Sequence, residues 1–401
     1  MRALVFKPVP ASLTRGSASS SPKILLPLAL VVLTLATVAA ASSSDPPAQP
    51  SAQPLELTHR VQPWNFLSVV GQKAAVFGYE NGTFEAWVYP LKILRNFHFE
   101  FRTQDALIPA RFLARTVIVR PESTTILYAY DQFSVREIIV VPVHEKGVII
   151  RLEIDSYIPL LIEASFERDL QLMWPAGLGG AFESWDGDLA AFVMGEEQRK
   201  FFAVVGSPGA RELRQEHVTN YAISVLSGFR LEPVAKGRSV RTLVIAGSVD
   251  GRSQAESAYR HLLASADPMQ QESAAYYRDY LDRTISAELP DRHLQQAYDW
   301  ARVSVLQGMV ENPFLGAGLV AGYRISGPTA RPGFAWFFGR DSEWTDLALV
   351  AEGDFPNTRR ALEFILQRQR EDGKVPHEIS QSASFVNWFK DFPYAFASAD
   401  A

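Results

Sequence analysis

The chain has 401 residues, enough for two domains, because single hydrophobic cores rarely grow beyond about 250–300 residues. Hydrophobic side chains make up 47% and charged ones 21%, as in ordinary globular proteins, and the lack of cysteine excludes a disulfide framework, thiol catalysis and cysteine-ligated zinc. The net charge of −5 becomes −9 once the four cations of residues 1–41 are set aside, so no basic stripe favours a nucleic-acid partner.

The first 41 residues are predicted to be a signal peptide or an N-terminal membrane anchor. Four cations precede an apolar run at 24–38, and three alanines before Ser42 suit signal peptidase. The 18 residues 24–41 also reach the lower limit for a membrane span, so the anchor stays open as the alternative. Either way the rest of the chain is expected outside the cytoplasm, in the periplasm or the extracellular space. Residues 42–56 are predicted to form a Pro/Ala/Ser linker.

Residues 57–250 show the pattern of a β-sandwich. Short runs of β-branched and aromatic residues alternate with turn residues, and Asn81-Gly82 between two of them is a strong hairpin signal. Many strands at regular spacing, with no helical period between them, indicate two packed sheets. The predicted strands are residues 74–79, 84–88, 115–120, 124–130, 134–141, 147–154, 201–205, 222–226 and 239–247.

From residue 251 the period becomes helical. Two linking helices, at 254–265 and 269–286, are expected within 251–290, with Asp267 as a cap and Pro268 in the first turn. Apolar residues at a spacing of three to four predict further helices at 291–310, 341–351 and 357–369, and another that begins at 381–396. Residues 312–339 form an aromatic, glycine-rich connection, and loops of this length are usually functional.

The end of the connection and the start of the helix predicted at 341–351 share the run RPGFAWFFGRDSEWTD, residues 331–346. This run resembles the first-hairpin motif of the six-hairpin glycosidases, most closely that of glycogen-debranching (amylo-α-1,6-glucosidase) enzymes and their bacterial relatives. Residues 81–90 (NGTFEAWVYP), 372–378 (DGKVPHE) and 394–400 (YAFASAD) are similar to other segments of the same group. The resemblance covers about residues 57–401. It implies an α+β multidomain fold, an N-terminal β-sandwich followed by an (α/α)6 barrel.

Such a barrel needs about twelve helices, so residues 291–401 are expected to supply only its first hairpins. Glycoside hydrolysis with inversion needs a carboxylic acid and a carboxylate base about 6.5–9.5 Å apart. The resemblance places both in later hairpins, beyond Ala401. The catalytic residues are therefore unknown, and activity of the chain by itself is not expected.

The resemblance also implies a sugar-binding role for the Gly-Arg-Asp run. A charged Asp341 accepts two hydroxyl protons at once, Arg340 orients it or donates to the same sugar, and Trp336 stacks on the sugar ring. Further candidates for the sugar pocket are His377, Glu378, Trp388, Lys390 and Asp400. The alternative for Arg340 and Asp341 is a structural salt bridge, with Asp341 capping the following helix.

Four further residues of the helix that begins at Asp341 are not assigned to the sugar site. Glu343 and Asp346, at positions i+2 and i+5, are expected off the face of Asp341, while Trp344 and Leu347 are expected in the core. Seven histidines without a close pair indicate no metal site, and nothing indicates a cofactor.

The sequence as a whole predicts an exported glycoside hydrolase acting on α-glucosidic or related oligosaccharides by inversion. A non-catalytic carbohydrate-binding or scaffold protein is one alternative. A glycoside phosphorylase of the same architecture is another alternative. The predicted export disfavours it, because phosphate esters are scarce outside the cytoplasm. A membrane contact is expected only through residues 24–41.

Overall fold

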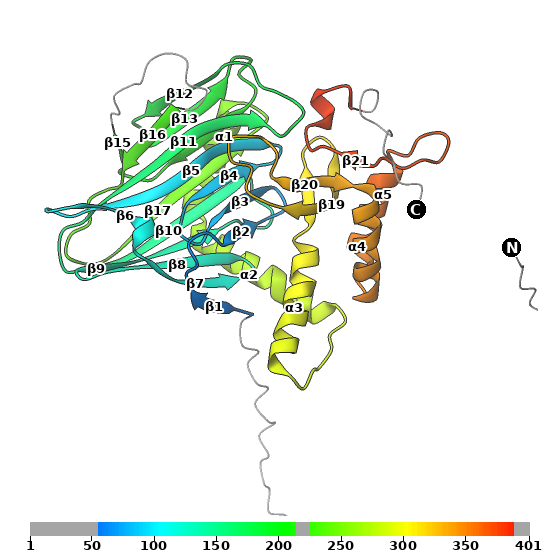
Figure 1. Ribbon diagram of the computed structural model, residues 1–401. Coiled ribbons are helices and arrows are strands. Elements are labelled where there is room, and N and C mark those ends of the chain that lie inside the picture. The colour runs from blue at the N-terminus through cyan, green and yellow to red at the C-terminus, as the bar shows by residue number, and fades with distance from the viewer. Residues whose placement is uncertain (1–54, 214–224, 389–401) are drawn as a thin grey trace, which may run out of the picture. The chain divides into compact units, whose positions relative to one another are not determined.

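The computed structural model of the protein describes residues 55–213 and 225–388 (Figure 1). The predicted leader at 1–41, nearly all of the linker, and the site candidates Lys390 and Asp400 lie outside the described residues. The described residues belong to one compact unit, residues 54–401. None of their helices is both long and apolar enough to cross a membrane.

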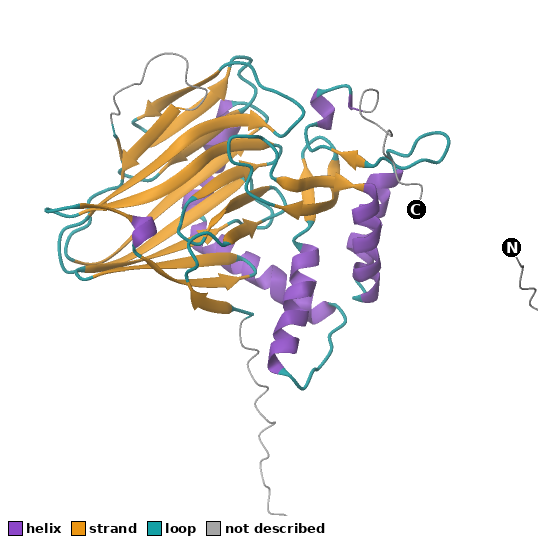
Figure 2. Ribbon diagram, viewed as in Figure 1, coloured by secondary structure: helices purple, strands orange, loops and turns teal. Residues whose placement is uncertain are grey.

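Two antiparallel sheets dominate the described part of the chain (Figure 2). The first has nine strands, in the order β1 (Leu57–Arg60), β7 (Ala114–Arg120), β8 (Ser123–Tyr130), β9 (Phe133–Val140), β10 (Gly147–Ser156), β17 (Gly237–Ser248), β14 (Phe202–Gly206), β13 (Ala191–Glu196) and β12 (Ala181–Asp186). The second has eight, in the order β15 (Arg211–Glu212), β16 (Val225–Arg230), β11 (Leu161–Leu172), β5 (Leu91–Arg102), β4 (Phe84–Val88), β3 (Ala74–Tyr79) and β2 (Phe66–Val70), with β6 (Leu107–Pro109) paired to β5.

One hydrophobic core lies between these sheets. Ile150 and Leu152 of β10 belong to the same buried cluster as Phe99 and Phe101 of β5, and the Phe101 ring lies 5.3 Å from that of Phe133 on the opposite sheet. Alternation along each strand sends every second side chain into this cluster, because successive strand residues point to opposite faces. The two sheets are antiparallel, and the core that they share agrees with the predicted β-sandwich.

Helices and a third sheet cover the outer faces. Helix α1 (Arg252–Ala264) packs Tyr259 and Leu262 against the outer face of the first sheet. The outer face of β3 and β4 is covered by a small sheet of β18 (Met309–Asn312), β19 (Gly316–Tyr323), β20 (Gly333–Phe338) and β21 (Glu378–Ile379), through a cluster that includes Phe77, Trp87 and Phe337. This contact brings the aromatic motif against the second sheet.

The remaining helices are α2 (Ala266–Arg283), α3 (Arg292–Leu306), α4 (Gly339–Ala351) and α5 (Phe355–Leu366). Asp291 is the N-cap of α3, and its side chain accepts hydrogen bonds from the backbone N–H groups of His293 and Leu294. Asp267 does not cap α2, contrary to prediction, because it lies in the first turn and pairs with Arg151 at 2.7 Å. Helix α3 ends at Leu306, earlier than predicted, and β18 starts three residues later.

One prediction about the C-terminal part is wrong. Residues 312–339 were expected to form a loop, but they contain β19 and β20. Gly318 of β19 leaves room for two phenyl rings, because an added Cβ would lie 2.8 Å from the Phe364 side chain and 3.0 Å from that of Phe337. Of the helix expected within 381–396, the described residues contain a 3-10 turn at Ala383–Phe385 and a helical Trp388, and residues 389–396 lie outside the described part of the chain.

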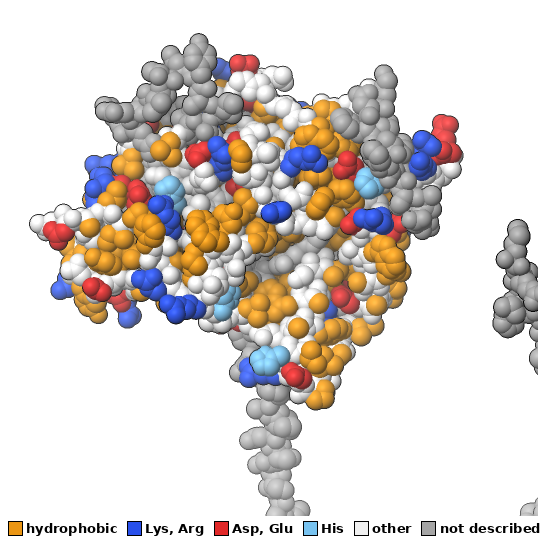
Figure 3. Space-filling view, in the orientation of Figure 1, with side chains coloured by type: hydrophobic (Ala, Val, Ile, Leu, Met, Phe, Trp, Pro, Cys, Tyr) orange, Lys and Arg blue, Asp and Glu red, His pale blue; other side chains and the backbone are white. Residues whose placement is uncertain are grey.

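Helix α4 buries the opposite face from the one predicted. Trp344 and Leu347, expected in the core, are 70% and 61% exposed, whereas Ser342 and Asp346 are buried. The buried face of α4 contacts β19 and α5. Figure 3 shows hydrophobic side chains gathered on the surface over α3 and α4.

Glu137 of β9 is a buried acid that should make stability depend on pH. Tyr128 donates a hydrogen bond to it at 2.5 Å, and burial raises the pKa of Glu137 from its usual value of 4.5 to about 8. Between these values the folded protein keeps a proton that the unfolded chain releases, so stability falls as pH rises through this window. In the unchanged protein, the free energy of unfolding should fall on the order of a few kcal/mol between about pH 5.5 and 8.5, and Glu137→Gln should abolish this fall. Urea denaturation at each pH measures both.

The exposed Glu197 provides the control for this change. Glu197→Gln should leave the pH dependence of the unfolding free energy as it is in the unchanged protein. Equal pH slopes for Glu137→Gln and the unchanged protein would show that Glu137 does not retain its proton.

Candidate functional site

The Gly-Arg-Asp run and the His377-Glu378 pair, far apart in the sequence, meet at the edge of the small sheet. Strand β20 pairs with β21 so that Phe338 lies opposite Glu378. The backbone N–H of Gly339 donates to the carbonyl of His377 at 3.0 Å. An added Cβ at Gly339 would lie 2.5 Å from the carbonyl oxygen of Pro376, so this close approach requires glycine. The sheet edge therefore unites two groups of predicted site residues.

Arg340 and Asp341 lie in the first turn of α4, with their charged ends accessible to solvent. The Arg340 Nη2 and Asp341 Oδ2 atoms are 3.5 Å apart, and the side chains are 58% and 36% exposed. Phe338 occupies the N-cap position of α4, so Asp341 is not the cap that the structural alternative required. A loose, exposed ion pair contributes little to stability and leaves both groups able to bind a ligand.

Two buried tryptophans hold Glu378. The indole N–H of Trp336 donates to Glu378 Oε2 at 2.9 Å, and that of Trp388 donates to the Glu378 carbonyl at 3.1 Å. Each ring is 1% exposed, so neither offers a face to a sugar here. Stacking by Trp336 and a wall role for Trp388 therefore stay predictions, and the contact that the structure gives to both indoles is with Glu378. His377 is half-buried, with its ring edge-on to Phe338 at 5.6 Å.

Trp174, which follows β11 in the second sheet, brings the sandwich into this site. Its ring lies 6.2 Å from Trp336 and 5.8 Å from Trp388, and the Arg331 guanidinium lies over it at 4.1 Å. The backbone N–H of Trp174 donates to the Ala330 carbonyl at 2.9 Å. Sequence reasoning missed Trp174, because it lies outside the recognised motifs, and gave Arg331 no role.

Glu85 of β4 fixes the segment that precedes the motif. Its carboxylate accepts four hydrogen bonds of 2.8–3.0 Å, from the backbone and hydroxyl of Ser326, the backbone of Gly327 and the indole of Trp87. Burial raises the pKa of Glu85, while the nearby Lys92 acts in the opposite direction. Residue 85 belongs to the resembling run 81–90, but its contact across 241 residues was not predicted.

Lys92 of β5 completes this arrangement, which we call the Glu85 clamp (Glu85, Lys92, Ser326, Gly327 and Thr329). The fully buried ammonium donates to the carbonyl of Thr329 at 3.0 Å and to that of Gly327. It is paired with Asp169 at 2.5 Å and lies 3.8 Å from Glu85. The clamp ties the second sheet to the loop that leads into β20.

Asp346, five residues after Asp341 on α4, is a buried acid to which the sequence analysis assigned no role. It is 4% exposed, and neither carboxylate oxygen has a hydrogen-bond partner among the described residues. Burial, with a smaller contribution from Glu343, raises its pKa to about 7. No group of three or more His, Asp or Glu side chains within the described ranges could hold a metal ion.

Comparison with solved structures supports the fold. A bacterial glucoamylase in complex with acarbose aligns with a TM-score of 0.55 and 10% identity, over 82% of this chain and 56% of that chain. A human-microbiome protein assigned as a kojibiose phosphorylase aligns with a TM-score of 0.53 and 9% identity, over 83% and 53% of the two chains. The chain thus spans about half the length of these neighbours. No protein-family model and no curated protein matches the sequence.

Both neighbours share the fold of the described residues, and neither singles out the debranching group. At 9–10% identity the likeness concerns the fold alone. The closed (α/α)6 barrel stays a prediction.

Proposed function

We propose that this chain is part of an exported glycoside hydrolase, with a sandwich at 57–250, linking helices at 251–290 and the first barrel hairpins from 291. Its site at the Gly-Arg-Asp turn binds the terminal glucosyl unit of an α-glucosidic or related oligosaccharide. The observation that carries the proposal is the exposed Arg340–Asp341 pair, held beside an anchored Glu378. The neighbour in complex with acarbose supports a saccharide ligand.

The chemistry of binding follows from these side chains. Asp341 accepts hydrogen bonds from two sugar hydroxyls, and charge-assisted bonds of this kind are about twice as strong as neutral ones. Arg340 donates to a hydroxyl or the ring oxygen. Trp336 donates to Oε2 of Glu378, and Oε1 of the same carboxylate would accept from a third hydroxyl.

The reaction proposed for the whole protein is hydrolysis with inversion, for which we assign no residue here as acid or base. The likeness to a kojibiose phosphorylase favours phosphorolysis as a second candidate. Turnover of an α-glucoside only in the presence of inorganic phosphate would identify that reaction. Saturable binding without turnover in the whole protein would identify the third candidate, a carbohydrate-binding protein.

Asp341→Asn tests the binding role directly. The change keeps the shape of the side chain and removes its charge, so a saccharide such as acarbose should bind about ten- to hundredfold more weakly, as for the loss of a charged hydrogen bond. Isothermal titration calorimetry measures the affinity. Glu343→Gln, on a different face of α4, should bind as the unchanged protein does. Unchanged affinity combined with a lower Tm for Asp341→Asn would support the structural salt bridge instead.

A further inference from the structure

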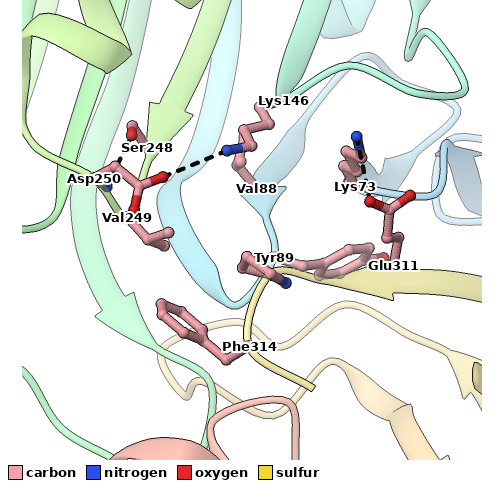
Figure 4. A pocket seen from close by; sticks show the side chains of 10 residues that line it. Lys73, Val88, Tyr89, Lys146, Ser248, Val249, Asp250, Glu311 and Phe314 are labelled. Atoms are coloured by element: carbon pink, nitrogen blue, oxygen red, sulfur yellow. Dashed lines mark hydrogen bonds and ion pairs between the residues drawn. The ribbon is translucent and has the colours of Figure 1, made fainter. Parts of the chain in front are cut away.

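A second candidate binding site lies where the ends of sandwich strands meet the end of β18 and the residues that follow it (Figure 4). The pocket has a volume of about 300 Å³ and shares no lining residue with the Gly-Arg-Asp site. It is formed by the turn between β2 and β3, the turn between β4 and β5, the start of β10, the end of β17, and residues 311–314. The lining residues used below are Lys73, Tyr89, Lys146, Asp250, Glu311 and Phe314.

Charged groups of both signs surround the pocket. Lys73 lies 3.4 Å from Glu311 on one side, and Lys146 lies 3.7 Å from Asp250 on the other. Both separations exceed the 2.7–3.2 Å typical of a direct hydrogen bond, so the four charged ends keep donors and acceptors for a ligand. Their side chains are between 27% and 60% exposed. The site is neutral in sum, with ammonium donors and carboxylate acceptors facing the same space.

Aromatic rings lie along another side of the pocket. Tyr89 is buried, and Phe314 is 38% exposed. The Phe314 ring packs edge-on against Phe385 at 4.8 Å, and its backbone N–H donates to Asn312 Oδ1 at 2.9 Å. Because Phe314 is held from both its ring and its backbone, little conformational freedom remains to be lost when a ligand binds.

The second sheet also fixes the side of the pocket that carries Lys73 and Glu311. Glu311 donates its backbone N–H to the carbonyl of Gln72 at 2.8 Å, and Tyr89 donates its own to the carbonyl of Lys73 at 2.9 Å. On the other side, the Asp250 backbone N–H donates to the Ser248 hydroxyl at 2.9 Å. These bonds hold the turns in place independently of the charged ends, which are therefore available for binding.

We propose that this pocket binds one neutral hexopyranose unit, at a site separate from the Gly-Arg-Asp turn. A sugar hydroxyl both donates and accepts, so it suits walls that present ammonium and carboxylate groups together. Phe314 suits the apolar C–H face of a pyranose, and a pocket of this volume lies at the small end of ligand sites. The two ammonium groups and two carboxylates balance, so the site favours no net charge on its ligand, and a neutral sugar fits it better than a phosphate or a uronic acid.

The experiment measures sugar binding by the full 401-residue chain carrying Asp341→Asn, so that binding at the Gly-Arg-Asp turn is weakened. Methyl α-glucoside and maltotriose are titrated and followed by saturation-transfer NMR. We expect saturable binding to persist, and Asp250→Asn or Phe314→Leu, added singly, should weaken it about ten- to hundredfold. Glu371→Gln and Phe112→Leu, at exposed positions outside the pocket, should leave it unchanged.

The outcomes separate the two sites. If sugar binding by the Asp341→Asn chain persists and neither pocket change weakens it, the pocket proposal is overturned. The proposal is also overturned if the Asp341→Asn chain does not bind sugar at all, and binding by the unchanged chain then supports the Gly-Arg-Asp site. If Asp341→Asn leaves sugar binding unaltered and the pocket changes abolish it, the pocket is supported and the proposed function of Asp341 is overturned.

A folding control and a choice of ligand complete the experiment. Thermal melting reports whether Phe314→Leu folds, and if it does not, Asp250→Asn replaces it, because the Asp250 side chain is 60% exposed. Binding of methyl α-glucoside supports recognition of a single unit, and binding of maltotriose alone overturns it in favour of a longer chain segment.

Discussion

Replacing Glu85 with alanine should lower the free energy of unfolding by about 3–5 kcal/mol, as expected when one partner of a buried, hydrogen-bonded charge network is removed. Ser326, Gly327 and Trp87 would lose the acceptor for four hydrogen bonds, and Lys92 would keep Asp169 as its remaining carboxylate partner. Urea denaturation followed by circular dichroism measures the loss. Limited proteolysis should show new cleavage near residues 326–329, because the clamp holds this loop on the second sheet.

Two variants test the cause of this loss. Glu85→Gln retains one acceptor oxygen and the side-chain volume, so its loss should fall between that of alanine and zero. Glu371→Ala removes an exposed glutamate and should change the free energy of unfolding by less than about 0.5 kcal/mol. A similarly small effect of Glu85→Ala would mean that the clamp does not stabilise the fold.

The Glu85 clamp also shows what the sequence could and could not predict. The runs 81–90, 331–346 and 372–378 were selected by resemblance, and the structure connects all three. Glu85 holds the loop before β20, and Glu378 lies opposite Phe338. Local patterns cannot predict these contacts, because each joins residues that are tens to hundreds of positions apart. Trp174 carries no local signal, so only the folded chain places it in the site.

The helical part exposes a different limit of prediction. The positions of helices followed from the spacing of apolar residues, but the burial of α4 did not. The usual rule turns the apolar stripe of a helix toward the core. In α4 the buried face includes Ser342 and Asp346, while Trp344 and Leu347 are exposed. The fold packs this face of α4 against β19 and α5, a choice that the pattern of the helix alone does not contain.

The two proposed roles for an aromatic residue in the motif, core packing and sugar stacking, can be separated at Trp336. Trp336→Ala should lower the free energy of unfolding by about 3–5 kcal/mol, because it removes a ring that is 1% exposed and packed near Trp174 and Phe338. Trp344→Ala is the matched control. It removes the same side chain from a position that is 70% exposed, so its effect on stability should be small.

Trp336→Phe completes the test, because it keeps most of the packing and removes only the hydrogen bond to Glu378. If the indole positions Glu378, this variant should stay folded, with a Tm near that of the unchanged protein, and bind sugar several-fold more weakly. A stacking role predicts a different result, since a phenyl ring also stacks on a sugar and would preserve affinity. Calorimetric titration with acarbose, combined with thermal melting, distinguishes the two. If Trp336→Ala keeps the stability of the unchanged protein but no longer binds sugar, the ring does not contribute to folding. That result would support the stacking role.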